Sequence, residues 1–110
     1  MSLADRVIDG AAEAVMITDA DNRIVRVNPA FERITGYTAA EAIGAGPSLL
    51  SSGKQGRRFY EDLWFALRNR GEWQGEIWNK RKSGEIYPEW VSISVLRLSL
   101  IHISEPTRPY

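Results

Sequence analysis

Two long segments near the carboxyl end of the chain alternate apolar and polar residues, and this pattern constrains the fold more than any other. The first segment runs from Trp73 to Lys80 and the second from Tyr87 to Leu96, with the turn residues Lys82-Ser83-Gly84-Glu85 between them. A period of two residues places alternate side chains on opposite faces of a strand. The two segments therefore predict a long β-hairpin.

The amino-terminal quarter predicts a helix followed by a shorter hairpin. Ser2-Leu3-Ala4-Asp5 resembles a capping box, and Gly10 would end the helix that this box opens. The apolar runs Val15–Thr18 and Ile24–Val27 then flank the turn-rich segment Asp19–Arg23. Short apolar runs on either side of such a turn are typical of paired antiparallel strands.

Three further helices are expected between the two hairpins. A capping residue followed by Pro, a capping box or helical spacing of apolar residues favours a helix, and glycine favours the left-handed conformation that ends one. The predicted starts are Asn28-Pro29, Thr38-Ala39-Ala40-Glu41 and Phe59, and the predicted ends are Gly36, Gly44 and Gly71. The segment 45–58 is rich in Gly, Ser and Pro and is predicted to be a loop.

Strands at both ends with helices between them favour an α+β fold, in which an antiparallel sheet carries short helices on one face. The length of 110 residues suits a single domain. Acidic and basic residues number 14 each, which argues against a strong preference for nucleic acid or an anionic membrane. No Ser/His/Asp order, pair of catalytic acids or metal-ligand spacing is visible, so the chain is predicted not to be an enzyme and to hold no metal.

The chain has no cysteine, which excludes disulfides, thiolate metal sites and cysteine nucleophiles. No apolar run approaches the roughly 20 residues that span a bilayer, and the first residues lack the pattern of a signal peptide. The sequence therefore predicts a soluble, cytoplasmic protein without a membrane segment.

The order of several short motifs resembles that of the PAS domain family from about Asp9 to Arg97. The motifs are Ala14-Val15-Met16-Ile17-Thr18-Asp19, Asn28-Pro29-Ala30-Phe31, Ile34-Thr35-Gly36-Tyr37, Glu41-Ala42-Ile43-Gly44, Trp73-Gln74-Gly75-Glu76 and Asn79-Lys80-Arg81-Lys82-Ser83-Gly84. The resemblance implies a PAS fold, in which short helices cover a pocket over a five-stranded antiparallel sheet. It assigns residues 1–97 to the domain, with 1–10 as an N-terminal flanking helix.

The tail 98–110 departs from the family. A PAS domain would continue into a final, central strand, whereas the residues from Leu98 onward look like out-of-frame or adapter-derived translation. The last strand is therefore expected to be missing, or to be replaced by Leu98–Ile103 as an extension of the strand before it. Loss of that strand would expose unpaired backbone edges, so the fragment is predicted to be marginally stable or prone to aggregation.

The resemblance implies a sensory domain that detects a ligand or a redox change and regulates an output domain in the same polypeptide. Its subtype is similar to PAS domains that precede cyclic-dinucleotide enzymes and histidine kinases, and it implies a homodimer formed through the N-terminal helix and the sheet. One alternative is a non-covalent, FAD-binding redox sensor. A second alternative is a cofactor-free interaction module.

The flavin alternative rests on three candidate cofactor-binding residues. In flavin-binding relatives, the tryptophan of the Trp-x-Gly segment and a following asparagine lie near the isoalloxazine ring. The matching residues here are Trp73 and Asn79, and Trp90 is the third candidate. Haem is not expected, because the only histidine, His102, lies in the tail, and a cysteine–flavin adduct needs the thiol that the chain lacks.

Each candidate residue also has a plain structural interpretation, which the sequence favours. Buried tryptophans are mostly packing residues, and Asn79 would satisfy the hairpin backbone. Gly75 leaves room in a strand for a close approach of backbone or ligand. The basic clusters Lys80-Arg81-Lys82 and Arg57-Arg58 are expected to be solvated turns rather than nucleic-acid sites.

Overall fold

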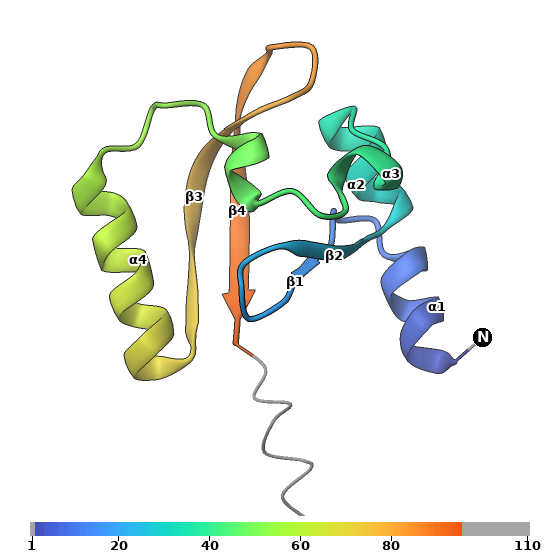
Figure 1. The fold of residues 1–110 in the computed structure, drawn as a ribbon, viewed down its shortest axis with the longest axis horizontal. Helices are drawn as coiled ribbons and strands as arrows, with labels where there is room; N and C mark the ends of the chain where they lie inside the picture. The colour runs from blue at the N-terminus through green and yellow to red at the C-terminus, as the bar shows by residue number, and fades with distance from the viewer. Residues whose placement is uncertain (1, 96–110) are drawn as a thin grey trace, which may run out of the picture. The chain divides into compact units, whose positions relative to one another are not determined.

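The computed structural model describes residues 2–95 and contains the predicted elements in the predicted order (Figure 1). These elements are α1 (Leu3–Gly10), β1 (Met16–Thr18), β2 (Ile24–Val27), α2 (Pro29–Thr35), α3 (Ala39–Ala42), the 3₁₀ helix η1 (Pro47–Leu50), α4 (Arg57–Arg70), β3 (Glu72–Lys80) and β4 (Ile86–Ser94). The described strands form two two-stranded sheets, β1–β2 and β3–β4. The tail 98–110, where the last strand of the family was expected to be missing or replaced by Leu98–Ile103, lies outside the described residues.

The chain divides into two compact units that share the long hairpin. Of the described residues, the first unit holds 2–54 and 78–89, which include the tip of the β3–β4 hairpin. The second unit holds 55–77 and 90–95, which include α4 and the base of the same hairpin. No helix among residues 2–95 combines the length and the apolar character that crossing a membrane requires.

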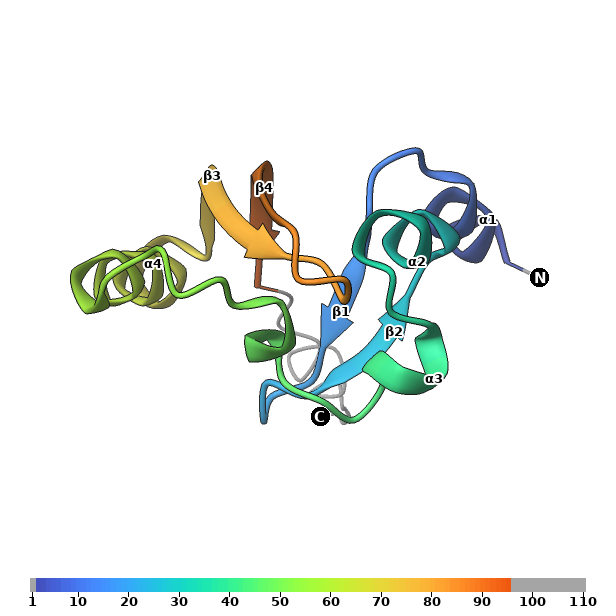
Figure 2. The same ribbon diagram turned by 90° about the horizontal axis from the view of Figure 1, so that it is seen from above.

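The first unit is built on the β1–β2 hairpin, whose strands run side by side (Figure 2). Its antiparallel register pairs Met16 with Val27 and Ile17 with Arg26, and shifts before Thr18. The core cluster of this unit comes from β2 and from three helical segments that follow it. Its buried members are Ile24, Phe31, Ala42 and Leu50.

The helix boundaries in the first unit are set by the capping residues that the sequence predicted. The side chain of Asn28 accepts a hydrogen bond from the backbone N–H of Phe31, and Gly36 ends α2 with a φ of 84°. Thr38 and Glu41 cap each other's backbone N–H groups at the start of α3. The helix then ends at Ala42 rather than at the predicted Gly44.

Asn28 is 1% exposed and uses both ends of its amide to join three parts of the unit. Its Oδ1 accepts hydrogen bonds from the N–H groups of Val15 and Phe31, at 2.8 and 2.9 Å. Its Nδ2 donates to the carbonyl oxygens of Ile8 in α1 and of Glu13, at 2.9 and 3.0 Å. One side chain therefore ties α1, the segment before β1 and the first turn of α2 together.

An ion-pair cluster also holds α1 in place. The guanidinium of Arg26, on β2, contacts the carboxylates of Asp5 and Asp9, at 2.5 and 3.3 Å. Because Asp5 and Asp9 are four residues apart, they lie on the same side of α1. The hydrogen bond from Arg26, assisted by Ser2, holds the pKa of Asp5 below its ordinary value of 3.8.

This ion pair predicts a pH-dependent contribution to stability. Because the pKa of Asp5 is lower in the folded state, the ion pair makes its full contribution to stability above pH 3.8, the ordinary pKa. This contribution is lost as the pH falls through the pKa that Asp5 has in the folded state. We therefore expect Asp5→Asn to lower the melting temperature at neutral pH and to have a smaller effect near about pH 3. Thermal melts at the two pH values check this, with Asp62→Asn as control, because the pair of Asp62 with Arg58 is longer, at 3.5 Å. An equal effect of Asp5→Asn at both pH values would contradict the prediction.

The predicted loop 45–58 was wrong in two places. Residues Pro47–Leu50 form a 3₁₀ helix, with Pro at its first turn. Leu50 is buried in the core of the first unit and Leu49 packs against it, so burial of these two side chains favours a helical turn there. At its other end the predicted loop gives way to α4 at Arg57, two residues before the predicted start.

The second unit packs α4 against the base of the long hairpin. Leu63 and Leu67 of α4 are buried together with Ile77 of β3, while Phe59, Trp73, Val91 and Ile93 pack around them. The helical spacing of apolar residues in α4 is thus confirmed, and Gly71 ends the helix with a φ of 75°. The side of α4 that faces away from this core is exposed.

Candidate functional site

The two long strands of the hairpin each have one exposed face and one less exposed face, as the alternation predicted. On β3, Trp73 and Asn79 belong to the less exposed face. On β4, the alternation places Tyr87 and Glu89 on the less exposed face and Trp90 on the opposite one. Trp90 is 68% exposed, so it does not share a face of its strand with the partly buried residues.

Four polar residues at the tip of the hairpin gather in the first unit, and we call them the Tyr87 cluster: Asn79, Arg81, Tyr87 and Glu89. The Nδ2 of Asn79 donates a hydrogen bond to Glu89, at 2.9 Å. The guanidinium carbon of Arg81 lies 3.9 Å from the centre of the Tyr87 ring. The side chain of Asn79 thus binds a carboxylate through its Nδ2.

Tyr87 is the central member of this cluster, because its hydroxyl is buried and has no hydrogen-bond partner among residues 2–95. The residue is 8% exposed, and its Oη is the one buried side-chain polar atom among the described residues that has no hydrogen bond. Burial raises the pKa of the Tyr87 hydroxyl, and the negative charge of Glu89 adds to that effect. The hydroxyl therefore stays protonated and can donate a hydrogen bond as well as accept one.

Arg81 connects the Tyr87 ring to the end of helix α2. Its guanidinium donates a hydrogen bond to the carbonyl oxygen of Ile34, in the last turn of α2, and a second one to Glu85, at 2.8 Å. These contacts stand against the expectation that the basic cluster at 80–82 is merely solvated. The side chain of Arg81 is 30% exposed, so the turn is solvated only in part at this residue.

Lys82 holds the same turn against the two neighbouring helices. Its backbone N–H donates to the carbonyl oxygen of Thr35, at 2.8 Å, and its ammonium group pairs with Glu41 of α3. The ion pair with Lys82 lowers the pKa of Glu41. A change at the Tyr87 ring therefore has a direct physical connection, through Arg81 and this turn, to α2 and α3.

Trp73, the first candidate flavin residue, is a packing residue of the second unit. Its ring meets Phe59 edge to face, with the ring centres 5.6 Å apart. The same indole lies over Gly75, where an added Cβ would come within 2.8 Å of the ring. The room left by Gly75 is therefore filled by the ring of Trp73.

The expectation that the tryptophans are mainly packing residues was wrong for the other three. Trp64 is 43% exposed, Trp78 is 37% exposed and Trp90 is more exposed still. Trp78 has the ammonium group of Lys54 at 5.5 Å from its ring centre. Helical spacing and strand alternation allow an aromatic side chain on either face, so composition alone could not separate these residues from Trp73.

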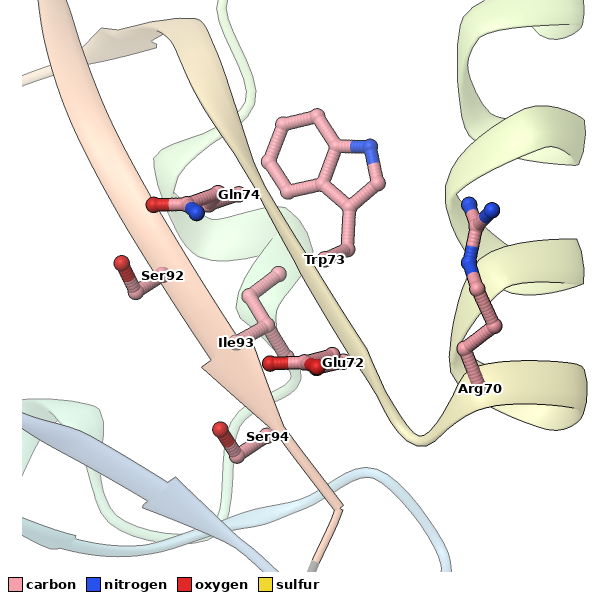
Figure 3. A pocket seen from close by; sticks show the side chains of 7 residues that line it. All are labelled: Arg70, Glu72, Trp73, Gln74, Ser92, Ile93 and Ser94. Atoms are coloured by element: carbon pink, nitrogen blue, oxygen red, sulfur yellow. The ribbon is translucent and has the colours of Figure 1, made fainter.

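A cavity of about 450 Å³ lies at the base of the hairpin in the second unit (Figure 3). Figure 3 shows Trp73 projecting from β3 on the side of α4, whereas Gln74 projects from the opposite face. The other residues that line the cavity are Arg70, Glu72, Ser92, Ile93 and Ser94. The polar residues among them that lie on β3 and β4, namely Glu72, Gln74, Ser92 and Ser94, are exposed, so the cavity is a surface depression without a buried polar group.

The residues that the sequence interpretation missed are Tyr87, Glu89 and Arg81. A signal for two of them was present, because extending the alternation of Val91 and Ile93 backwards places Glu89 and Tyr87 on the same face. A charged residue at an inward position of a strand needs a partner. Among residues 2–95 no cluster of His, Cys, Asp and Glu could hold a metal ion.

Comparison with known proteins points to one family. A family model described as PAS domain matches residues 12–104. The nitrogen fixation regulatory protein of Klebsiella oxytoca is 37% identical over 81 residues, which cover 74% of this chain and 16% of that protein. The aerotaxis receptor of Escherichia coli (strain K12) is 31% identical over 74 residues, which cover 67% of this chain and 14% of that protein.

The fold also resembles that of solved PAS domain structures. The crystal structure of the PAS domain of a protein from Colwellia psychrerythraea is 27% identical, with a TM-score of 0.71, and the match covers 77% of this chain and 72% of that one. The two curated relatives are several times longer, since this chain spans only 16% and 14% of their lengths.

Proposed function

This chain belongs to the PAS domain family and is a sensory signal-transduction module, and we propose that it senses a small polar ligand that contacts the Tyr87 cluster. Both the family and the α+β fold predicted from the motifs are confirmed. The observation that carries the proposal is the buried hydroxyl of Tyr87. A buried hydroxyl without a partner costs roughly 1–3 kcal/mol, and a ligand that accepts its hydrogen bond recovers that free energy.

The cluster also indicates the chemistry of such a ligand. Tyr87 and Arg81 offer donors, Glu89 offers a carboxylate acceptor, and Asn79 offers both an acceptor and a second N–H. A ligand with hydrogen-bond donors and acceptors along one edge would match this set. A ligand that contacts Tyr87 would displace the guanidinium of Arg81, which lies over the Tyr87 ring. Because Arg81 donates a hydrogen bond to the carbonyl oxygen of Ile34, this displacement would change the conformation at the end of α2.

A flavin is the second candidate ligand, and the placement of Asn79 favours it. The amide of Asn79 is held by Glu89 on the less exposed face of β3, where it can address the polar edge of a flat ring. Of the three residues named from the sequence, Trp73, Asn79 and Trp90, only Asn79 belongs to the same unit as the Tyr87 cluster, and the flavin proposal rests on it. Trp73 packs on Phe59 and Trp90 is exposed, so Asn79 is the best supported of the three.

One measurement separates these functions. We expect native mass spectrometry of the purified chain to show a small-molecule adduct that Tyr87→Phe diminishes several-fold, although Tyr87→Phe stabilises the ligand-free protein by roughly 1 kcal/mol. An adduct with the mass and visible absorbance of FAD supports the flavin proposal, and Asn79→Ala should then reduce it. An adduct of another mass rules out flavin but supports ligand sensing.

Two outcomes limit the proposal. If Trp90→Ala leaves the adduct unchanged, Trp90 is not a binding residue. If no adduct forms, even after reconstitution with FAD, and the chain still dimerises, ligand sensing fails and the cofactor-free interaction module is supported.

We further propose that the chain is a non-catalytic, cytoplasmic part of a longer signalling protein with an output domain in cis, a role consistent with relatives named as a regulatory protein and a receptor.

We also propose a homodimer formed through α1 and the sheet, and the surface of α1 supports its part in it. Leu3 and Val7 are four residues apart on this helix and are 75% and 64% exposed, while Asp5 and Asp9 bind the helix to Arg26. A helix that is attached by its acidic residues and presents apolar ones to solvent favours a contact with another helix.

A further inference from the structure

The outer side of α4 carries a small group of exposed residues with an unusual symmetry, which we call the α4 face: Glu61, Trp64, Phe65 and Arg68. Each is three or four residues from two of the others, so they are neighbours on the helix surface. Trp64 and Phe65 are 43% and 60% exposed. Exposed aromatic residues beside a charge are typical of interaction surfaces, since Trp and Arg dominate the binding energy of many interfaces.

The charges on the α4 face are complementary to those on the α4 face of a second copy of the chain. Glu61 and Arg68 are equally far, along the helix, from the midpoint between Trp64 and Phe65. A half-turn about an axis through that midpoint exchanges the position of Glu61 with that of Arg68, and Trp64 with Phe65. Two copies of the helix that face each other across such an axis therefore bring opposite charges together twice and aromatic rings together twice.

We propose that the α4 face pairs with the α4 face of a second copy of this chain, with the two helices antiparallel across a two-fold axis between Trp64 and Phe65. In this register, Glu61 of one copy lies opposite Arg68 of the other. The proposal is independent of any ligand and of the contact through α1.

The other charged contacts of α4 leave this pairing free to form. Glu61 meets Arg57 at 3.5 Å in an exposed pair, and such pairs contribute little to stability. Arg68 has no ion pair among the residues that the structure describes. A strongly acidic or basic partner is not favoured, since the α4 face carries one charge of each sign.

A pairing of single helix faces is small, so we expect weak and concentration-dependent association. Interfaces at the low end of the size range are typical of transient complexes. Sedimentation velocity of the full 110-residue chain over about 10 µM to 1 mM covers the range in which a dissociation constant near micromolar or weaker is measurable.

Charge reversal tests the register. Arg68→Glu alone places two glutamates opposite each other at both ends of the face, and Glu61→Arg alone places two arginines there. We expect each single reversal to weaken the dimer roughly tenfold and the double variant E61R/R68E to restore it to within about threefold of the wild type. Because both residues are exposed, the circular dichroism spectra should not change.

The contact through α1 provides the matched control. Leu3→Glu combined with Val7→Glu should leave the effect of the α4 reversals, and their rescue, intact. If the single reversals leave the dissociation constant unchanged, if the double variant fails to recover it, or if the chain is monomeric throughout, the α4 pairing is wrong. If only the α1 variant disrupts the dimer, the α4 pairing is also wrong. None of these outcomes bears on the proposed sensory function.

Discussion

Replacing Asn28 with alanine is expected to lower the free energy of unfolding by about 3–4 kcal/mol, a large share of the stability of so small a domain. The amide is 1% exposed and makes four hydrogen bonds, to Ile8, Glu13, Val15 and Phe31. Alanine would leave their backbone groups without that partner and remove the cap of α2. Urea unfolding followed by circular dichroism measures the loss.

Two variants control for the chemistry of the substitution. Asn69→Ala removes an exposed asparagine whose side chain donates to the carbonyl oxygen of Phe65, and we expect a change within about 0.5 kcal/mol. Asn28→Asp keeps the acceptor for Val15 and Phe31 but loses the donors to Ile8 and Glu13, so its cost should be substantial as well. If Asn28→Ala costs no more than Asn69→Ala, Asn28 does not hold the three segments together.

Replacing Gly75 with valine is expected to cost about 2–3 kcal/mol through overpacking of the second unit. The added Cβ alone would lie 2.8 Å from Cζ2 and 2.9 Å from Cη2 of the Trp73 ring. The ring cannot shift freely, because it packs on Phe59 and on the core around Leu63 and Leu67. Thermal and urea melts of the variant give the cost directly.

A double variant distinguishes a clash with Trp73 from a general loss of strand structure. Trp73→Leu combined with Gly75→Val should recover most of the lost stability relative to Gly75→Val alone, because the shorter side chain frees the space. Gly10→Ala, at a site with no atom within 4 Å of the added Cβ, should be close to neutral. Equal costs for Gly75→Val with and without Trp73 would show that the indole is not the obstacle.

Local signals predicted most of the element boundaries in this chain. Asn28 and the Thr38–Glu41 box start their helices because a capping side chain bonds to N–H groups only two or three residues ahead. Gly36 and Gly71 stop theirs because a left-handed residue depends on the backbone alone. The 3₁₀ turn Pro47–Leu50 was missed because burial of Leu50 depends on partners distant in sequence.

The candidate site was less predictable than the fold. A motif was enough to name Asn79 and Trp73 as candidates. It could not predict which residue each side chain would contact. Their contacts with Glu89 and with Phe59 join residues 10 and 14 positions apart. Tyr87 was quoted only as part of a strand, since nothing local indicates that a hydroxyl will be buried without a partner.

The sequence by itself determined the family, the order of the elements and the two faces of the long hairpin, because caps, turns and alternation act over a few residues. Only the tertiary structure decided that Arg81 stacks on Tyr87 and reaches Ile34, that Trp73 fills the space over Gly75, and that Trp64 and Phe65 stay exposed. Each of these outcomes depends on which segments fold against one another. Burial is a property of the packed chain, and it is burial that makes the hydroxyl of Tyr87 the candidate sensing group.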